Sequence, residues 1–329
     1  MPQPLKNGEV LRDRYQIRER IGQGGTGSIY LADDTRLDGR LCALKEVEYD
    51  RVLPPEVLAQ AREQFFREAS VLARLDHPNL PKVSDFFTYE QRDYLVMDYV
   101  PGKDLRERML EARRGKSFLS EKEVLRWAVQ LADALNFLHH QEPPIIHRDI
   151  KPSNLKITPS GLLKLVDFGL VKIMAPDEVT ITVIQGQGTA LYTPLEQYGG
   201  DDAHTDPRAD IFSFGATLYH LLTNEPPSEA RKRFLDTRNL VPPREINPHL
   251  SAHVEKAILW AMSLHPDNRP KSVVEFRDAL LGKQEVPSRN PSNGAGFDLP
   301  NFTVVTREQL AGYAAAGLFL LGLIATLAR

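Results

Sequence analysis

The sequence has very little cysteine and no obvious export signal. A single cysteine, Cys42, occurs among 329 residues, so no disulfide can form within the chain. Cys42 lies in an apolar segment, 41–44, and no histidine or asparagine pattern marks it as a nucleophile, so we expect a buried structural thiol. The first residues contain no apolar stretch long enough for a signal peptide. We therefore expect the bulk of the chain to stay in the cytoplasm.

A strong charge of either sign is also missing. The formal net charge is -3, which argues against a nucleic-acid binder that relies on a basic surface. Apolar residues make up 42% of the chain, a share close to that of globular domains and above that of disordered chains. The sequence contains no internal repeat. It therefore predicts a globular protein with no nucleic-acid partner.

The composition changes sharply after Gly282. Residues 283–309 are rich in Pro, Ser, Asn and Gly, which predicts a flexible linker. Residues 310–328 are almost wholly apolar and uncharged. As a helix they would rise about 28 Å, close to the ~30 Å hydrocarbon core of a bilayer. We predict one transmembrane helix that tethers the chain to the cell membrane, and a buried C-terminal helix docked on the domain is the alternative.

The part before the linker has strand patterns first and helical patterns afterwards, which indicates an α+β fold. Alternating or β-branched segments predict strands over residues 15–21, 28–32, 41–47 and 94–97. Apolar residues at helical spacing predict helices over about 54–75, 123–139, 211–222 and 252–262.

A glycine-rich turn lies between the first two predicted strands. Dinucleotide-binding folds use similar glycines, but there the glycines end a strand and begin a helix. A strand–turn–strand hairpin without side chains at its tip can lay backbone N–H groups over a triphosphate. An ordinary glycine-rich hairpin is the alternative. The residues of this candidate nucleotide-binding turn are Ile21, Gly22, Gln23, Gly24, Gly25, Thr26, Gly27, Ser28 and Ile29.

A lysine and a glutamate form the next candidate pair. Lys45 lies on the third predicted strand, and Glu68 lies about two dozen residues later on the first predicted helix. Ala69 and Leu72 place that part of the helix against the core. A Lys45–Glu68 ion pair would hold the ammonium group toward the α- and β-phosphates of a nucleotide. Glu63 is the alternative partner.

The most specific pattern is the polar loop over residues 147–154, His-Arg-Asp-Ile-Lys-Pro-Ser-Asn. Asp149 can accept the proton of a substrate hydroxyl group, and Lys151 can neutralise charge on a transferred phosphoryl group. Asn154 and Asp167 offer oxygen ligands for Mg²⁺, which also needs phosphate oxygens. Asp167 opens an Asp-Phe-Gly sequence that follows a predicted hairpin over residues 155–166.

This ordered set of motifs resembles the protein kinase superfamily, and most of all the eukaryotic-like serine/threonine kinases of bacteria. The resemblance covers about residues 10–281. It implies a bilobal fold with a β-rich N-lobe (10–98) and a mainly helical C-lobe (101–282), after a short extension (1–9). It also implies transfer of the γ-phosphoryl group of ATP to Ser or Thr hydroxyls of protein substrates, with Mg²⁺ or alternatively Mn²⁺.

The resemblance assigns further residues. Ala43, Met97, Asp98 and Val100 would surround adenine, with Met97 as gatekeeper and Asp98 and Val100 in the hinge between the lobes. Lys156 occupies the place where an apolar side chain usually lies beneath adenine, and its aliphatic stem could serve there. Asp210 would brace the catalytic loop, and Arg269 would pair with Glu196. Two more departures are Thr26 in the glycine-rich turn and Leu195 before Glu196.

Regulation is also implied by the resemblance. Arg148 precedes the catalytic aspartate, and kinases with such an arginine are often switched by phosphorylation of the activation segment. Thr180 and Thr182 are the candidate sites, unless they are plain loop threonines, and a homodimer would allow phosphorylation in trans. Alternative functions are an ATP-binding pseudokinase that acts as a membrane-tethered signalling scaffold, and a phosphotransferase for small molecules.

Overall fold

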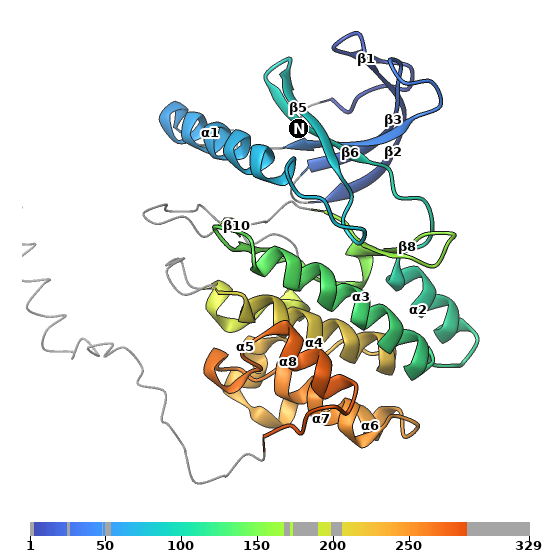
Figure 1. Cartoon of the computed structure of the whole chain (residues 1–329), viewed down its shortest axis with the longest axis vertical. Helices are drawn as coiled ribbons and strands as arrows, with labels where there is room; N and C mark the ends of the chain where they lie inside the picture. Colours follow the sequence, from blue (N-terminus) through green and yellow to red (C-terminus); the bar gives the residue numbers. More distant parts are fainter. Residues whose placement is uncertain are drawn as a thin grey trace, which may run out of the picture. The chain divides into compact units, whose positions relative to one another are not determined.

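Figure 1 shows the computed structural model of the chain, which describes residues 3–24, 27–47, 49, 54–167, 172–173, 190–198 and 206–287. The chain divides into two units, Met1–Val286 and Pro287–Arg329. Lys283 N donates to Asp278 O at 2.8 Å, so the first unit continues a few residues past the start of the predicted linker. The predicted transmembrane segment, 310–328, lies outside the described residues. Among the helices that are described, none has the length and apolar character of a membrane span.

The N-terminal part of the first unit is an antiparallel sheet with the strand order β1-β2-β3-β4-β6-β5. Its single long helix, α1 (Pro55–Leu72), connects β4 to β5. The four predicted strands and this helix are confirmed. The strands are β1 (Val10–Leu11), β2 (Tyr15–Gly24), β3 (Gly27–Asp34), β4 (Leu41–Val47), β5 (Val83–Tyr89) and β6 (Arg92–Asp98).

Aromatic and aliphatic side chains form a small core within this sheet. Tyr15 and Phe87 stack with ring centroids 5.6 Å apart, and Phe87 stacks in turn on Tyr94. Cys42 is 1% exposed in the same cluster. Burial raises the pKa of its thiol to about 12, so Cys42 is the inert structural thiol that the sequence predicted.

The C-terminal part is helical and lies below the sheet in Figure 1. Its predicted helices are confirmed with shifts of one or a few residues at their ends. The main helices are α2 (Leu105–Arg114), α3 (Glu121–His139), α4 (Arg208–Thr223), α5 (Ala230–Leu235), α6 (Pro243–Ile246), α7 (Ala252–Ala261) and α8 (Val273–Leu280).

Helix α4 is the centre of this part because it is buried on all sides. A β-carbon at Gly215 would lie 2.8 Å from the β-carbon of Ala261, so only glycine lets α4 and α7 approach this closely. One hydrophobic cluster runs from Leu72 and Met97 in the sheet part to Phe212 in α4. The two lobes therefore share a continuous core.

Short elements carry the polar loops between the lobes. The strand pairs are β7 (Ile145–Ile146) with β10 (Lys172–Ile173), and β8 (Leu155–Ile157) with β9 (Leu163–Leu165). The short 3-10 helices are η1 (Pro152–Asn154), η2 (Ala190–Tyr192), η3 (Leu195–Tyr198), η5 (Thr237–Asn239) and η6 (Pro266–Asn268).

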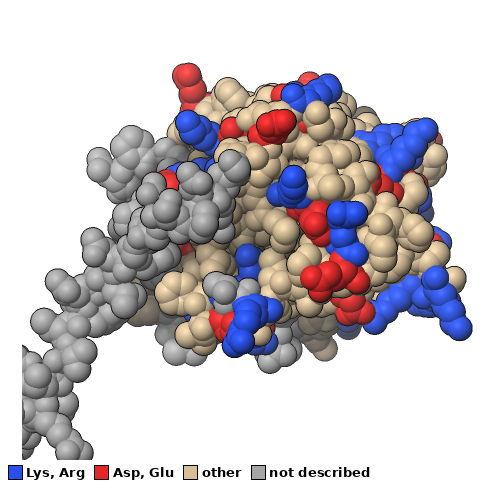
Figure 2. All heavy atoms as spheres, turned by 90° about the horizontal axis from the view of Figure 1, so that it is seen from below, with Lys and Arg blue, Asp and Glu red and all other residues tan. Residues whose placement is uncertain are grey.

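The surface mixes charges of both signs. On the face of the described residues that Figure 2 shows, Lys and Arg side chains lie between Asp and Glu side chains. Ion pairs of the surface also join residues three positions apart, such as Arg126 with Glu123 and Lys232 with Glu229. Such exposed pairs contribute little to stability.

Candidate active site

The polar loop over residues 147–154 begins directly after β7 and is held by Asp210 at the start of α4. Asp210 Oδ2 accepts the backbone N–H of His147 at 2.9 Å, and Oδ1 accepts that of Arg148 at 2.8 Å. Arg148 has a φ of 67°, in the left-handed region that is unfavourable for a residue with a side chain. Two hydrogen bonds to one carboxylate hold this conformation, so the predicted bracing role of Asp210 is confirmed.

Asp210 is completely buried, so its protonation state depends on whether burial or the groups around it have the larger effect on its pKa. Burial alone would raise its pKa, but the hydrogen bond from His139 Nε2, at 2.8 Å, the electrostatic effects of His139 and His147, and the backbone N–H of Arg148 outweigh burial and leave the pKa lowered. Asp210 is therefore an ionised acceptor. His139, at the end of α3, was not predicted, because a histidine in the last turn of an amphipathic helix carries no functional signal in sequence.

Asp149 lies inside this loop with its two carboxylate oxygens in different situations. Oδ2 accepts Lys151 Nζ at 2.8 Å and Asn154 Nδ2 at 2.9 Å. Oδ1 is buried and has no hydrogen-bond partner among the described residues. A buried unpaired acceptor is costly. One oxygen of Asp149 is thus oriented by its neighbours while the other is available to a hydroxyl donor.

Asn154 is oriented by the same loop. Its Nδ2 donates to Asp149 O and Oδ2, both at 2.9 Å, which directs its Oδ1 away from Asp149. Val166 N donates to Asn154 O at 2.8 Å. This bond ties the loop to the residue before Asp167, so the two predicted metal ligands are connected through one backbone contact.

Asp167 and Lys45 form an ion pair between the two lobes. Asp167 has a φ of 69°. Burial would raise its pKa, but Lys45 outweighs burial and the pKa is lowered. Glu68 on α1 accepts Gln64 Nε2 at 3.0 Å. The structure therefore pairs Lys45 with Asp167, and the Lys45–Glu68 ion pair stays a prediction.

The donors around this ion pair fit a magnesium ion bound together with phosphate oxygens. Asn154 offers an amide oxygen and Asp167 a carboxylate, and Mg²⁺ commonly takes one or two such protein ligands with substrate phosphates and water. The described residues contain no group of three or more His, Cys, Asp and Glu side chains placed to hold a metal. When bound, the ion would neutralise charge on the phosphate oxygens.

The glycine-rich turn is a hairpin. β2 pairs with β3 as far as Gly24 opposite Gly27, so the next described element after β2 is a strand. This excludes the dinucleotide-binding arrangement. Gly25 and Thr26, at the tip, lie outside the described residues. Ile29 at the base of the turn is the register partner of Lys45, so the turn and the lysine belong to adjacent strands.

The residues expected around adenine lie on β4, β6 and β8, except Val100, which follows β6. Ala43 pairs with Met97 across β4 and β6, and both are buried. Lys156 on β8 forms an isolated bridge to Asp104, and its Nζ lies 5.7 Å from the centroid of the Tyr99 ring in the hinge. The ammonium group of Lys156 thus lies beside the hinge. Its role beneath adenine stays a prediction.

The segment over residues 190–198 is fixed to the C-lobe by Arg269. The guanidinium donates to Glu196 Oε1 at 2.6 Å and Oε2 at 3.0 Å, so the predicted Glu196–Arg269 pair is confirmed. Tyr192 in the same segment has its hydroxyl 2.7 Å from His220 Nδ1. Thr180 and Thr182 lie outside the described residues.

Comparison with known proteins places this site in a family. The model of the protein kinase domain family matches residues 15–284. A probable serine/threonine-protein kinase of Clostridium acetobutylicum is 37% identical over 281 residues, which cover 83% of this chain and 40% of that protein. Serine/threonine-protein kinase PknB of Mycobacterium leprae is 30% identical over 323 residues, covering 91% of this chain and 50% of that protein. The chain therefore spans half or less of the length of these relatives.

Solved structures agree with the sequence match. The crystal structure of a mutant PknI kinase domain of Mycobacterium tuberculosis superposes with a TM-score of 0.65 at 28% identity, covering 85% of this chain and 99% of that one. The apo form of PpkA-294 has a TM-score of 0.66 at 27% identity, covering 84% and 99%. The predicted fold, with a β-sheet N-lobe and a helical C-lobe, is confirmed. The chain belongs to the protein kinase family, among the PknB-like serine/threonine kinases of bacteria.

Proposed function

We propose that the chain transfers the γ-phosphoryl group of ATP to serine or threonine hydroxyls of proteins, with Mg²⁺ or Mn²⁺ as the metal. The observation that carries this proposal is the state of Asp149. Its Oδ2 is oriented at 2.8 Å by Lys151 and at 2.9 Å by Asn154, while its buried Oδ1 lacks a partner among the described residues. A hydroxyl group that donates to Oδ1 would be positioned for attack, and its proton would pass to Asp149.

The cationic side chains have separate tasks in this proposal. Lys151 lies beside Asp149 and would stabilise charge on the transferred phosphoryl group. Lys45, 5% exposed, would move between Asp167 and the α- and β-phosphates when the nucleotide binds, with Glu68 as a second partner. The nucleotide would lie under the turn over residues 21–29, with adenine against Ala43, Met97, Asp98, Val100 and Lys156.

The membrane tether is part of the same proposal. We assign the kinase domain to residues 10–282, the linker to 283–309 and the transmembrane helix to 310–328, with the kinase domain on the cytoplasmic side. Deletion of residues 310–328 should move the protein from the membrane fraction to the soluble fraction without lowering its phosphoryl transfer. A truncated protein that still sediments with membranes would contradict the proposed tether but not the proposed phosphoryl transfer.

We further propose that the activation segment is autophosphorylated at Thr180 or Thr182 within a homodimer. The support is Arg148, which precedes Asp149 and whose backbone is held by Asp210. A phosphate could pair with its guanidinium group and order the segment. Phosphopeptide mapping of active protein tests this, and the absence of phosphate from both threonines would contradict it.

Phosphoryl transfer itself is tested with the purified full-length chain, labelled ATP, Mg²⁺ and a general protein substrate. Asp149→Asn should lower transfer at least ~100-fold while nucleotide binding is kept. Asp133→Asn, a carboxylate that is 50% exposed on α3, is the matched control and should keep full activity.

Two other outcomes would replace the proposal. If the unmodified chain binds ATP tightly but transfers nothing, it is a pseudokinase scaffold. If it phosphorylates only a small metabolite, it is a small-molecule phosphotransferase.

A further inference from the structure

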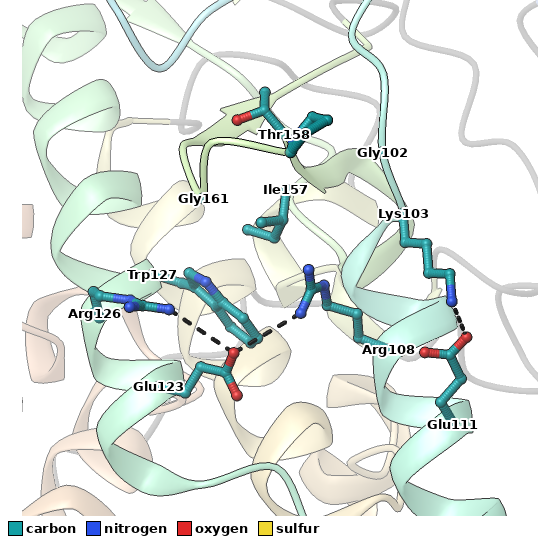
Figure 3. Close-up of a pocket in the computed structure, with 11 residues that line it drawn as sticks. Gly102, Lys103, Arg108, Glu111, Glu123, Arg126, Trp127, Ile157, Thr158 and Gly161 are labelled. Atoms are coloured by element: carbon teal, nitrogen blue, oxygen red, sulfur yellow. Dashed lines mark hydrogen bonds and ion pairs between the residues drawn. The ribbon is translucent and has the colours of Figure 1, made fainter.

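A cavity of about 420 Å³ lies outside the catalytic site, between the residues that follow the hinge, helices α2 and α3, and the turn after β8 (Figure 3). Its volume is in the range of pockets that hold small ligands. The charged or aromatic residues that line it are Lys103, Arg108, Glu111, Glu123, Arg126 and Trp127.

The walls of the cavity are fixed by backbone contacts. Ile157 N donates to Lys103 O at 3.0 Å, which ties β8 to the residues after the hinge. Gly102 has a φ of 108°, and a β-carbon there would lie 2.1 Å from Ile157 O. Only glycine permits this approach. Trp127, which is 2% exposed, forms a rigid wall, so the cavity does not depend on a loose loop.

Two hydrogen-bond donors at the cavity have no partner in the part of the chain that the structure describes. Trp127 Nε1 and Arg108 Nε are buried and have no acceptor among the described residues. The guanidinium carbon of Arg108 lies 5.7 Å from the centroid of the Trp127 ring. Buried N–H groups in native proteins are nearly always paired. Because both unpaired groups are donors, the missing partner is an acceptor.

The charges in the cavity also favour an anion. Lys103 is hydrogen-bonded to Glu111, whereas Arg108 and Arg126 share Glu123 at 3.8 and 3.9 Å. Figure 3 shows Glu123 between the two arginines. Both distances exceed a hydrogen bond. The lining has three cations and two carboxylates, and this single excess positive charge suits a carboxylate better than a phosphate dianion.

We propose that this cavity binds a carboxylate, held by Arg108 and Arg126 against Trp127, either as an acidic side chain of a peptide or as a small dicarboxylate. The planar guanidinium group of Arg108 matches a carboxylate in a bidentate arrangement. Its side chain is 36% exposed. Among the described residues its guanidinium group lies over Trp127 and makes one long ion pair, to Glu123, so it can rotate to admit the ligand. The site does not depend on phosphoryl transfer.

Trp127 itself reports on binding. The chain has two tryptophans, and Trp260 lies on α7, outside the cavity. In a Trp260→Phe full-length chain without nucleotide, the fluorescence of Trp127 should change saturably with N-acetyl-aspartyl-leucine amide or with succinate. The ligand that saturates at lower concentration identifies the source of the carboxylate, and sodium chloride at equal ionic strength should cause no saturable change.

Three substitutions in this background decide the assignment. Arg108→Gln should weaken binding about tenfold or more. Glu123→Gln should tighten binding, because it removes the competing carboxylate. Arg114→Gln, an exposed residue of the same helix outside the cavity, should leave binding unchanged. Circular dichroism checks that each variant is folded. No saturable change with either ligand, or an unchanged affinity in Arg108→Gln, would overturn the proposal.

Discussion

Two arginines of the C-lobe sit over aromatic rings and face a glutamate, yet their surroundings differ. Arg269 lies 5.0 Å from the centroid of Phe212. It donates to Glu196 at 2.6 and 3.0 Å, and to three backbone carbonyls at 2.8, 2.9 and 3.1 Å. Its side chain is 0% exposed. Arg108 lies 5.7 Å from the centroid of Trp127, its Nε has no partner among the described residues, and its ion pair measures 3.8 Å.

The difference shows how to separate structural polar groups from groups available to a ligand. The donors of Arg269 are used within the protein, so this residue fixes the segment over residues 190–198. Arg108 Nε has no acceptor among the described residues, so Arg108 can still donate a hydrogen bond to a ligand. Asp149 shows both conditions in one side chain, because Oδ2 is satisfied by its neighbours and the buried Oδ1 lacks a described partner. Unsatisfied buried atoms are costly in a folded protein, and these two residues are the places where we propose chemistry and binding.

The largest effect on stability is expected for Arg269→Ala. This change leaves Glu196 without its partner in a nearly buried position and should lower the free energy of unfolding by about 3–5 kcal/mol. Urea denaturation measures the loss. Arg18 makes a similar fork to Asp33, at 2.6 and 2.7 Å, with its side chain 53% exposed, so Arg18→Ala should change the urea midpoint little. If both variants lower the urea midpoint by similar amounts, burial and full hydrogen bonding of the guanidinium group do not decide how much an arginine contributes to stability.

The second-largest effect on stability is expected for Asp210→Asn. The amide replaces one acceptor oxygen by an NH₂ group, which would face a donor from His147, Arg148 or His139. We expect a loss of about 2–3 kcal/mol in the free energy of unfolding, together with a strong loss of phosphoryl transfer because the loop that carries Asp149 loosens. Urea denaturation and the labelled-ATP assay measure the two effects. A stable variant that is also fully active would refute the bracing role.

The stability of the C-lobe should also depend on pH through His220, whose Nδ1 lies 2.7 Å from the hydroxyl of Tyr192. Burial, and then Arg113 and Arg106, lower the pKa of His220 to about 4, below its value of about 6.5 in the unfolded chain. The unfolded chain therefore binds the proton first, and stability falls as the pH drops from about 6.5 toward 4. At pH 5 the contribution of His220 should be lower by about 2 kcal/mol.

His220→Gln tests this contribution, because glutamine does not titrate but can still accept the hydroxyl of Tyr192. Urea denaturation at pH 7 and pH 5 should show a weaker pH dependence in the variant than in the unmodified chain. The same loss of stability in both proteins would assign the pH dependence to other groups.

The smallest effect on stability is expected for Arg108→Gln. Its ion pair is long and partly exposed, so the free energy of unfolding should change by less than about 1 kcal/mol. Urea denaturation compares it directly with Arg269→Ala. A loss as large as that of Arg269→Ala would show that Arg108 is a structural residue and would break the comparison.

Most of the architecture could be predicted because the patterns are local. The amphipathic helices α3 and α7 and the alternating strand β2 follow from side-chain periodicity alone. Strand β5 was not predicted. A register shift between Val83 and Asp85 interrupts the alternation that marks a strand, so its identity depends on pairing with β6.

The site could be predicted only in part for the same reason. Asp149, Lys151, Asn154 and Asp167 belong to short motifs whose spacing is visible in sequence. The family resemblance also predicted the Glu196–Arg269 pair, whose members are 73 positions apart. Distant partners that belong to no such motif are not visible in this way. His139 reaches Asp210 across 71 positions, and the pairing of Lys45 with Asp167 spans 122 positions.

The sequence by itself determined the family, the order of the lobes and the candidates for the catalytic groups, because each is written in contiguous residues. Only the tertiary structure decided which polar atoms are satisfied. Whether Arg108 differs from Arg269, or Oδ1 from Oδ2 of Asp149, depends on neighbours brought together by packing. Hydrogen bonding acts over about 3 Å in space, and sequence separation carries no measure of that distance.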